Sequence, residues 1–419
     1  MPHAPPLAEV EILSQGDEVL LGEVVDTNAA EIARAVTDLG VPVGRHACVG
    51  DDPDTIAALL REAAERVSEV ICTGGLGPTD DDHTAEAVAR AFALELFEHP
   101  RALEQIRARY ARFQRELDST GRRQARLPRG ARLLENRWGT APGFMLDRRP
   151  ARLWFLPGVP AEMRAMLAAH VLPALRERYP ELAPGRTVVF RCLGLGESHV
   201  QLELADIVAP GLRVGYRATL PEVQVKLRFA QDADPDAAEV VVAEVRRRLG
   251  AAVFAEEDGT PAGSIEEVVG RMLLARGETV ATAESCTAGR VAAALTRMSG
   301  SSAWLLEGAV VYSNAAKERA AGVPHAMLEA HGAVSEPVAR ALAEGIRARA
   351  GTTWGLATTG IAGPTGGSPE KPVGTVHIAV AGPEGTAHRA LRLPGDREQV
   401  MARTVASVLA LLREVMRGG

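Results

Sequence analysis

The chain has few cysteines and no long apolar run. None of its four cysteines stands in a Cys-x-x-Cys pair, so no disulfide framework is expected: Cys48, Cys72, Cys192 and Cys286. The longest apolar runs are too short for a membrane-spanning helix. The first nine residues lack the basic start and apolar core of a secretory signal. We therefore expect a cytoplasmic protein without a membrane partner.

Lysine is also nearly absent. The chain has 47 cationic residues, of which only three are lysines, and a bias in genome composition explains most of this imbalance. The net charge of −7 argues against nucleic acid as the main partner. A hydrophobic share of 46% and a charged share of 24% are typical of a globular protein. A length of 419 residues predicts two or three domains.

The first part of the chain alternates apolar strands with amphipathic helices. Strands are predicted at 9–14, 41–49 and 69–73, with helices at 28–39 and 53–67 between them. This alternation predicts an α/β domain with a parallel sheet covered by helices. Ligands of such sheets bind beyond the carboxyl ends of the strands.

The pattern changes near residues 182–185. The next segment predicts a small α+β domain, with a strand at 187–193, a helix at 197–207, two short strands near 218–221 and a helix at 235–249. A turn-rich linker at 258–263 precedes a second α/β domain. We therefore predict three domains, over residues 1–170, 171–255 and 256–419.

One serine and one lysine of the last domain form a candidate catalytic pair. Ser285 stands at a predicted strand-to-helix turn, and Lys317 follows 32 residues later. Arginine cannot lose its proton in a protein, but a desolvated lysine can, and a neutral lysine can activate a serine. Free N–H groups at the start of the helix could stabilise an oxyanion, and they belong to Cys286, Thr287, Ala288 and Gly289.

Other interpretations of this segment remain open. Ser285 could simply cap a helix, and Lys317 could be a solvated side chain. Cys286 is a rival nucleophile, although no histidine is close in sequence. A glycine-rich loop at 358–367 could approach a ligand through Gly360 and Gly363. Either of two arginines at the start of the last helix could bind a phosphate: Arg397 or Arg403.

Three motifs in this domain resemble the C-terminal domain of the CinA family. They are Ala-Glu-Ser-Cys-Thr-Ala-Gly at 283–289, Tyr-Ser-Asn-Ala-Ala-Lys at 312–317 and Thr-Gly-Ile-Ala-Gly-Pro-Thr-Gly-Gly at 359–367. The resemblance covers about 264–417 and implies a nicotinamide mononucleotide deamidase that needs no metal, in a homodimer. It also implies roles for four residues: Ser285 as nucleophile, Lys317 as base, and Tyr312 and Thr359 in the site.

A second glycine-rich loop follows the predicted strand 69–73. Its backbone N–H groups could hold a diphosphate at Gly74, Gly75, Gly77 and Thr79. Asn28 and four carboxylates should lie on the same rim, and the carboxylates could bind a divalent metal: Asp26, Asp81, Asp82 and Glu162. The alternative is that the aspartates only cap the following helix.

This first domain, over about 7–170, resembles the molybdopterin-binding fold as it occurs at the N-terminus of CinA proteins. The resemblance implies a metal-dependent ADP-ribose pyrophosphatase, in which Asp81 and Asp82 match paired aspartates and Asp80 takes a variable position. The middle domain resembles a KH-like connector, but it lacks a Gly-x-x-Gly loop with basic flanks, so RNA binding is not expected.

The predicted protein is therefore a bifunctional hydrolase of pyridine-nucleotide fragments, nicotinamide mononucleotide and ADP-ribose. Three alternatives remain. The first domain could bind a pterin or transfer an adenylyl group without cleaving ADP-ribose. The chain could be a scaffold for DNA-uptake or recombination proteins, or a serine amidase acting on other carboxamides.

Overall fold

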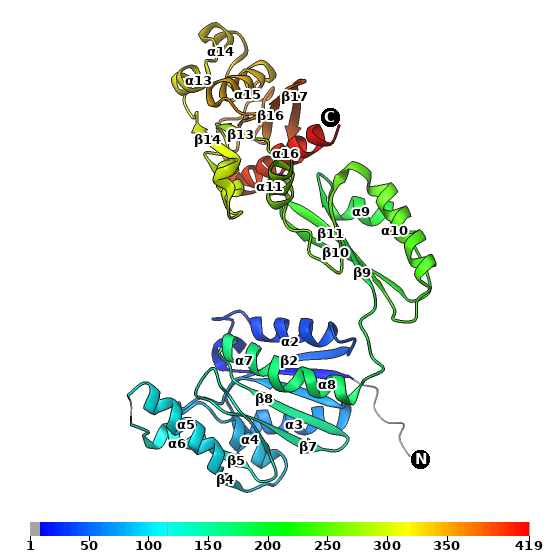
Figure 1. Cartoon of the computed structure of the whole chain (residues 1–419), viewed down its shortest axis with the longest axis vertical. Helices are drawn as coiled ribbons and strands as arrows, with labels where there is room; N and C mark the ends of the chain where they lie inside the picture. Colours follow the sequence, from blue (N-terminus) through cyan, green and yellow to red (C-terminus); the bar gives the residue numbers. More distant parts are fainter. Residues whose placement is uncertain (1–8, 115, 419) are drawn as a thin grey trace. The chain divides into compact units, whose positions relative to one another are not determined.

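The structure is a computed structural model that describes residues 9–114 and 116–418. The chain divides after Gly185 into two compact units, each described separately below (Figure 1). No helix within the described ranges is long and apolar enough to cross a membrane. The predicted domain boundaries at 170 and 255 stay predictions.

The first unit is built around a six-stranded sheet. The strand order is β2–β1–β3–β8–β7–β6, with β1 (Val10–Gln15), β2 (Val43–Val49), β3 (Glu69–Thr73), β6 (Arg132–Leu134), β7 (Gly143–Arg148) and β8 (Ala151–Leu156). Strands β2, β1, β3 and β8 run parallel to one another. Strand β7 is antiparallel to β8, and β6 is antiparallel to β7. A separate pair joins β4 (Leu96–Glu98) to β5 (Arg126–Pro128). The parallel sheet inferred from the sequence is thus confirmed, with an antiparallel extension.

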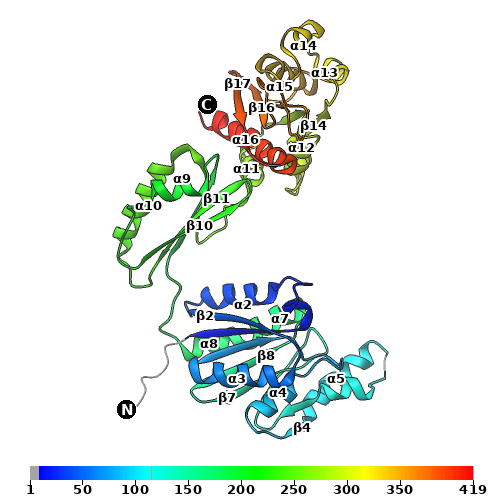
Figure 2. The same cartoon turned by 180° about the vertical axis from the view of Figure 1, so that it is seen from behind.

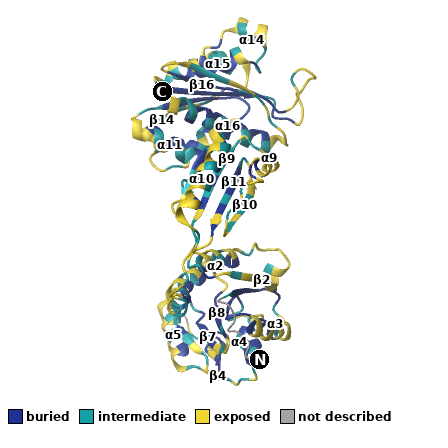
Figure 3. Ribbon diagram, turned by 90° about the vertical axis from the view of Figure 1, so that its right-hand side faces the viewer, coloured by how far each residue is buried: buried dark blue, intermediate teal, exposed yellow. Residues whose placement is uncertain are grey.

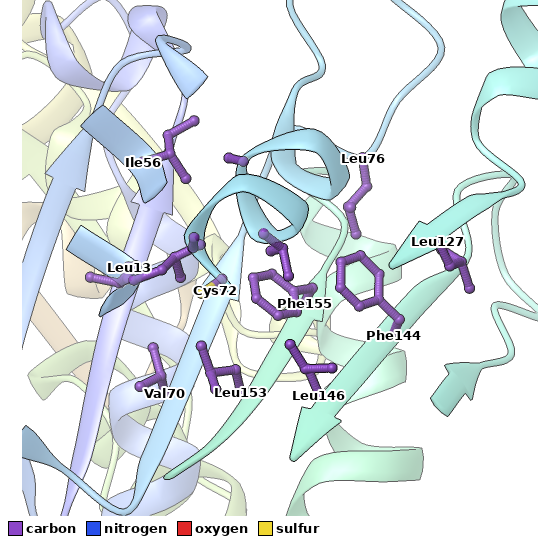
Figure 4. Close-up of a cluster of buried hydrophobic side chains, with 14 of the residues drawn as sticks. Leu13, Ile56, Val70, Cys72, Leu76, Leu127, Phe144, Leu146, Leu153 and Phe155 are labelled. Atoms are coloured by element: carbon purple, nitrogen blue, oxygen red, sulfur yellow. The ribbon is translucent and has the colours of Figure 1, made fainter. Parts of the chain in front are cut away.

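Helices cover both faces of this sheet. They are α1 (Asp17–Leu20), α2 (Thr27–Thr37), α3 (Pro53–Arg66), α4 (Thr84–Ala91), α5 (Pro100–Arg112), α6 (Ser119–Arg123), α7 (Pro160–Met166), the π-helical turn η1 (Leu167–Val171) and α8 (Leu172–Arg178). Neighbouring strand residues point to opposite faces. Leu13 and Phe155 therefore pack with α3, α4 and α5 (Figure 4), whereas Ile12 and Trp154 pack with α2, α7 and α8.

The second unit begins with a small α+β domain. Its antiparallel sheet has the order β10–β11–β9–β12, with β9 (Thr187–Leu193), β10 (Leu212–Thr219), β11 (Glu222–Phe229) and β12 (Val253–Asp258). Two helices, α9 (Glu197–Glu203) and α10 (Pro235–Leu249), bury alternate residues of β9 and β11 (Figure 1). A 3-10 turn, η2 (Gly250–Ala252), leads from α10 into β12.

The last domain contains a five-stranded sheet of order β14–β13–β15–β16–β17. The strands are β13 (Val280–Glu284), β14 (Leu305–Val310), β15 (Trp354–Gly360), β16 (Thr375–Gly382) and β17 (Gly385–Arg392). Strands β14, β13 and β15 are parallel to one another. Strand β16 is antiparallel to β15, and β17 is antiparallel to β16. Figure 3 shows β16 as mostly buried. The parallel strands end at one edge, where a ligand site is expected.

Two helix layers enclose this sheet (Figures 1 and 2). One layer holds α11 (Ile265–Arg276), α12 (Arg290–Thr296) and α16 (Arg397–Gly418), and the turn η3 (Ser301–Ala303) follows α12. The other holds α13 (Asn314–Ala321), α14 (His325–His331) and α15 (Glu336–Ala350). Under α15 the sheet offers mainly alanines. A Cβ at Gly355 would lie 2.1 Å from the Ala343 carbonyl oxygen, so only glycine permits this close packing.

Candidate active sites

A cavity of about 290 Å³ opens at the carboxyl ends of β13 and β15 in the last domain. This volume is near the lower limit for small-molecule sites, about 300 Å³. The lining residues come from three sequence motifs, from the loop before α15 and from the start of α16. They are Ser285, Cys286, Tyr312, Asn314, Lys317, Ala333, Val334, Thr359, Gly360, Ile361, Ala362, Gly363, Thr365, Gly366 and Arg397. The fold thus brings the predicted serine and lysine to one cavity.

Ser285 lies on a tight turn between β13 and α12. Its side chain is 9% exposed, and its N–H donates to the Thr358 carbonyl of β15 at 2.9 Å. Three residues later, Ala288 has a φ of 51°. A positive φ is uncommon for a residue other than glycine, so this turn is held by its surroundings.

The carboxylate of Glu284 holds this turn. Glu284 is buried, and it accepts hydrogen bonds from the N–H groups of Gly289 at 3.0 Å, Val291 at 2.9 Å and Ala292 at 2.8 Å. The Thr287 hydroxyl donates to the same carboxylate at 2.7 Å. The buried anion therefore satisfies the N–H groups that α12 leaves open at its start. Sequence reasoning missed this role, although Glu284 stands inside the serine motif.

This arrangement corrects the predicted set of oxyanion donors. The N–H of Gly289 is bound by Glu284, and the N–H of Ala288 donates back to the Ser285 carbonyl at 3.3 Å. Among the described residues, the N–H groups of Cys286 and Thr287 have no acceptor. Of these two, only Cys286 lines the cavity, whereas Thr287 is fully buried outside the lining, so Cys286 is the one of the four predicted donors at the cavity.

Lys317 is buried in α13, with 1% of its surface exposed. Its Nζ donates to two backbone carbonyls, those of Val311 at 2.9 Å and Tyr312 at 3.2 Å. Burial lowers the pKa of Lys317, because the charged form loses its hydration. A neutral amine has two N–H bonds and one lone pair. The two carbonyls can take both N–H bonds, which leaves the lone pair for the cavity that Ser285 also lines.

The rival nucleophile, Cys286, is in an unfavourable state. Its side chain is buried, and burial raises the pKa of its thiol to about 12. The thiolate is the reactive form, so Cys286 is a protonated thiol at neutral pH. The environment therefore favours Ser285 over Cys286 as the nucleophile.

The glycine-rich loop forms the opposite wall of the cavity. A Cβ at Gly360 would lie 2.7 Å from Val376 Cγ2, and Gly363 has a φ of 84°. Both positions therefore need glycine for packing or conformation, and both line the cavity. The Thr359 hydroxyl donates to the Ala333 carbonyl at 2.7 Å and so holds a neighbouring wall segment.

The structure separates the two candidate arginines. Arg397 lines the cavity and donates to the Gly363 carbonyl at 2.8 Å and to the Tyr312 hydroxyl at 3.1 Å. Arg403 is outside the lining and donates to the Pro394 carbonyl. The structure therefore places Arg397, and not Arg403, in the site. Asn314 also lines the cavity, although sequence reasoning gave it no role in the Tyr-Ser-Asn motif.

The first unit contains a cleft of about 440 Å³ at the carboxyl ends of β1, β3 and β8, which we call the first cleft. It brings together all nine residues predicted for this site: Asp26, Asn28, Gly74, Gly75, Gly77, Thr79, Asp81, Asp82 and Glu162. Asp80 is outside the lining and pairs with Arg123. The sequence therefore predicted the composition of this cleft well.

The glycine-rich loop of the first cleft does not present a free cradle for phosphate. The carboxylate of Asp82 accepts the N–H groups of Gly77 at 2.7 Å and Thr79 at 2.8 Å, and the Thr79 hydroxyl at 2.5 Å. The Gly74 N–H donates to the Leu156 carbonyl at 3.1 Å. Three of the four N–H groups predicted to hold a diphosphate therefore have acceptors within the fold, and their role in binding stays a prediction. Of these four loop residues, only Gly75 has an N–H without an acceptor among the described residues.

The predicted metal-binding group is also not assembled. Within the described ranges, no three histidine, cysteine, aspartate or glutamate side chains are placed to hold a metal ion. Asp26 instead caps α2 by accepting the Ala29 N–H at 2.9 Å, and Glu162 accepts from Asn136 at 2.5 Å. Asp82 closes its own loop, and a hydrogen bond with the Thr79 side chain lowers the pKa of Asp81, so all four carboxylates have partners within the fold.

The rim of this cleft nevertheless carries more negative charge than the sequence suggested. Glu18 and Asp51 also line it. Burial, with the neighbouring carboxylates of Asp17 and Asp81, raises the pKa of Asp51. Sequence reasoning missed these residues because Asp51 follows β2 and Glu18 lies in α1, and only the folded sheet brings both to the glycine loop.

Comparison with known proteins identifies the family. The CinA C-terminal domain matches residues 262–416, the probable molybdopterin binding domain 11–177, and the damage-inducible protein CinA KH domain 187–255. A CinA-like protein of Anaeromyxobacter dehalogenans (strain 2CP-C) is 46% identical over 412 residues, which cover 98% of this chain and 100% of that protein. The chain belongs to the CinA family. The predicted three-part architecture is thereby confirmed.

Other CinA proteins are similar to this chain. A CinA-like protein of Geobacter sulfurreducens is 46% identical over 408 residues, which cover 96% of this chain and 97% of that protein. The crystal structure of competence/damage inducible protein CihA from Agrobacterium tumefaciens has 38% identity and a TM-score of 0.35. It covers 37% of this chain and 98% of that one.

Proposed function

We propose that the last domain of this CinA-family protein deamidates nicotinamide mononucleotide to nicotinic acid mononucleotide and ammonia. The observation that carries the proposal is the buried Lys317, whose pKa is lowered and which lines the same cavity as Ser285. A lysine with a lowered pKa can be neutral at physiological pH and can accept the serine proton.

The reaction follows from these groups. The Ser285 hydroxyl oxygen attacks the carboxamide carbon, and its proton moves to Lys317. The oxyanion that forms is met by the N–H group of Cys286, which lines the cavity. Lys317 then protonates the leaving ammonia, which leaves an ester on Ser285. Water attacks this ester and transfers a proton to Lys317, which returns it to the Ser285 oxygen as nicotinic acid mononucleotide leaves.

Arg397 suits the phosphate end of the substrate. Its guanidinium stands at the cavity, oriented by the Gly363 carbonyl and the Tyr312 hydroxyl. Arginine binds phosphate through several N–H donors in a fixed geometry. The site then has a cation for the phosphate and a nucleophile for the carboxamide.

Replacing Ser285 with alanine should lower ammonia release from nicotinamide mononucleotide by at least about 10³-fold, since it removes the attacking oxygen. Cys286→Ala should cost far less, because it keeps the backbone N–H. Ammonia release by both purified, folded variants would be measured against the wild type. A strong loss in Cys286→Ala with activity retained in Ser285→Ala would reverse the assignment.

We further propose that the first cleft hydrolyses ADP-ribose to AMP and ribose 5-phosphate with a divalent ion. The acidic rim favours this requirement, because a bare diphosphate would be repelled by the carboxylates around the glycine loop. These carboxylates do not form a ligand set by themselves, so the ion would be bound largely by the phosphate oxygens.

Chelation should separate the two activities. EDTA should abolish AMP formation from ADP-ribose, and added Mg²⁺ or Mn²⁺ should restore it, while ammonia release from nicotinamide mononucleotide continues. AMP formation that persists in EDTA would disprove the metal requirement. Tight binding of molybdopterin without any AMP formation would favour the pterin-binding alternative.

A further inference from the structure

The floor of the first cleft contains an unusual set of buried polar atoms without partners. Buried polar side chains are nearly always hydrogen-bonded, so each exception needs a reason. Four such atoms belong to residues that line this one cleft and are at least nine-tenths buried. We name these residues the polar floor: Ser14 with its hydroxyl, Gln15 with Nε2, Asn28 with Oδ1 and Gln124 with Oε1.

The fold fixes which half of each amide stays unpaired. Asn28 donates its Nδ2 to the Thr73 hydroxyl at 3.0 Å and the Gly158 carbonyl at 2.8 Å. Gln124 donates its Nε2 to the Leu76 carbonyl at 3.0 Å. Both side chains are therefore left with an unpaired oxygen acceptor.

Gln15 is oriented in the opposite sense. Its Oε1 lies 2.5 Å from the Thr84 hydroxyl, which also lies 3.0 Å from the Gly74 carbonyl, and its amide N–H₂ is unpaired. Ser14 adds a hydroxyl that can donate or accept. The polar floor therefore offers two acceptors, one donor and one group of either kind.

We propose that the polar floor binds ribose hydroxyls and makes the first cleft selective for ribose over deoxyribose. A hydroxyl both donates and accepts, so a vicinal diol can pair with amide oxygens and with an amide N–H₂. A phosphate only accepts at neutral pH, so it cannot pair with Asn28 Oδ1 or Gln124 Oε1, and the acidic rim repels it. The inference rests on the proposed nucleotide-cleaving function of the same cleft.

Ser14→Ala tests this proposal most directly, because the Ser14 hydroxyl has no hydrogen-bond partner among the described residues. Calorimetric titration of the full chain with ribose 5-phosphate and Mg²⁺ should show affinity reduced by about five- to tenfold. Thermal unfolding should be unchanged. The wild type should bind 2-deoxyribose 5-phosphate more weakly than ribose 5-phosphate, and Ser14→Ala should narrow that difference. Any ribose 5-phosphate that binds at the cavity of the last domain contributes equally to the titrations of the wild type and of Ser14→Ala.

A matched pair of variants provides the control. Gln15→Glu and Gln105→Glu each keep a side-chain oxygen that accepts a hydrogen bond and replace an unpaired Nε2. Gln105 lies outside the cleft lining. Only Gln15→Glu should weaken ribose 5-phosphate binding. Equal effects of the two variants would overturn the proposal.

The outcomes distinguish the ribose site from the cleavage reaction. ADP-ribose cleavage with no preference for ribose, and with Ser14→Ala equal to wild type, would refute the polar floor and leave the activity standing. Selective ribose binding that Ser14→Ala weakens, without cleavage, would support the floor and refute the activity.

Discussion

Replacing Lys317 with arginine should reduce kcat for nicotinamide mononucleotide deamidation by about 10²–10⁴-fold, the usual contribution of a general base. Arginine keeps the positive charge but cannot accept the Ser285 proton. Lys317 is also buried, so the larger guanidinium has to displace neighbouring atoms. Ammonia release under saturating substrate measures the effect.

The pH profile gives an independent readout of the same residue. Burial lowers the pKa of Lys317, and only the neutral amine is a base. In the wild type, kcat/KM should therefore rise with pH until Lys317 is deprotonated and then level off. The plateau should begin below the ordinary pKa of lysine, about 10.4. Lys317→Met should lose this rising limb with the activity.

Lys226→Arg is the matched control, since it makes the same chemical change on β11, outside the cavity. It should retain wild-type deamidation. If Lys317→Arg, folded by circular dichroism, kept most of its activity, Lys317 would act only through its charge, and another base would be needed.

Replacing Glu284 with alanine should lower the free energy of unfolding of the last domain by about 3–5 kcal/mol. The change leaves the N–H groups of Gly289, Val291 and Ala292 without their acceptor, while the Thr287 hydroxyl keeps Thr358 Oγ1 as a partner at 2.7 Å. Each unsatisfied donor costs about 1–3 kcal/mol, although water entering the space offsets part of this. Hydrogen exchange over 280–296, followed by mass spectrometry, would locate the loss at the nucleophile turn.

Glu398→Ala is the comparison for this variant. Glu398 is an exposed carboxylate that pairs with Arg290, a residue of the same helix α12. Its loss should have little effect on exchange at the turn, because water screens such surface pairs. Equal protection of 280–296 in Glu284→Ala and in the wild type would show that the turn keeps its shape without this carboxylate.

The sequence was sufficient to predict several parts of the fold and of the sites. Strands β3 and β9 and helix α10 have the predicted limits, because turn and capping residues bound them locally. The βαβ alternation was enough to place both glycine-rich loops at the carboxyl ends of parallel strands. Strands β7 and β17 were not predicted, since each is stabilised by pairing with a neighbouring strand rather than by a strong local pattern.

The sequence by itself determined which residue types meet in each site. Ser285 and Lys317 meet in one cavity, and the aspartates lie beside the glycine-rich loop that follows β3. Only the tertiary structure decided which of their hydrogen-bonding groups remain available. Glu284 takes the N–H groups of α12, and Asp82 takes those of its own loop. The physical reason is that each donor or acceptor forms its hydrogen bond with whichever partner the folded backbone brings within about 3 Å. Residue spacing in the sequence does not specify that partner.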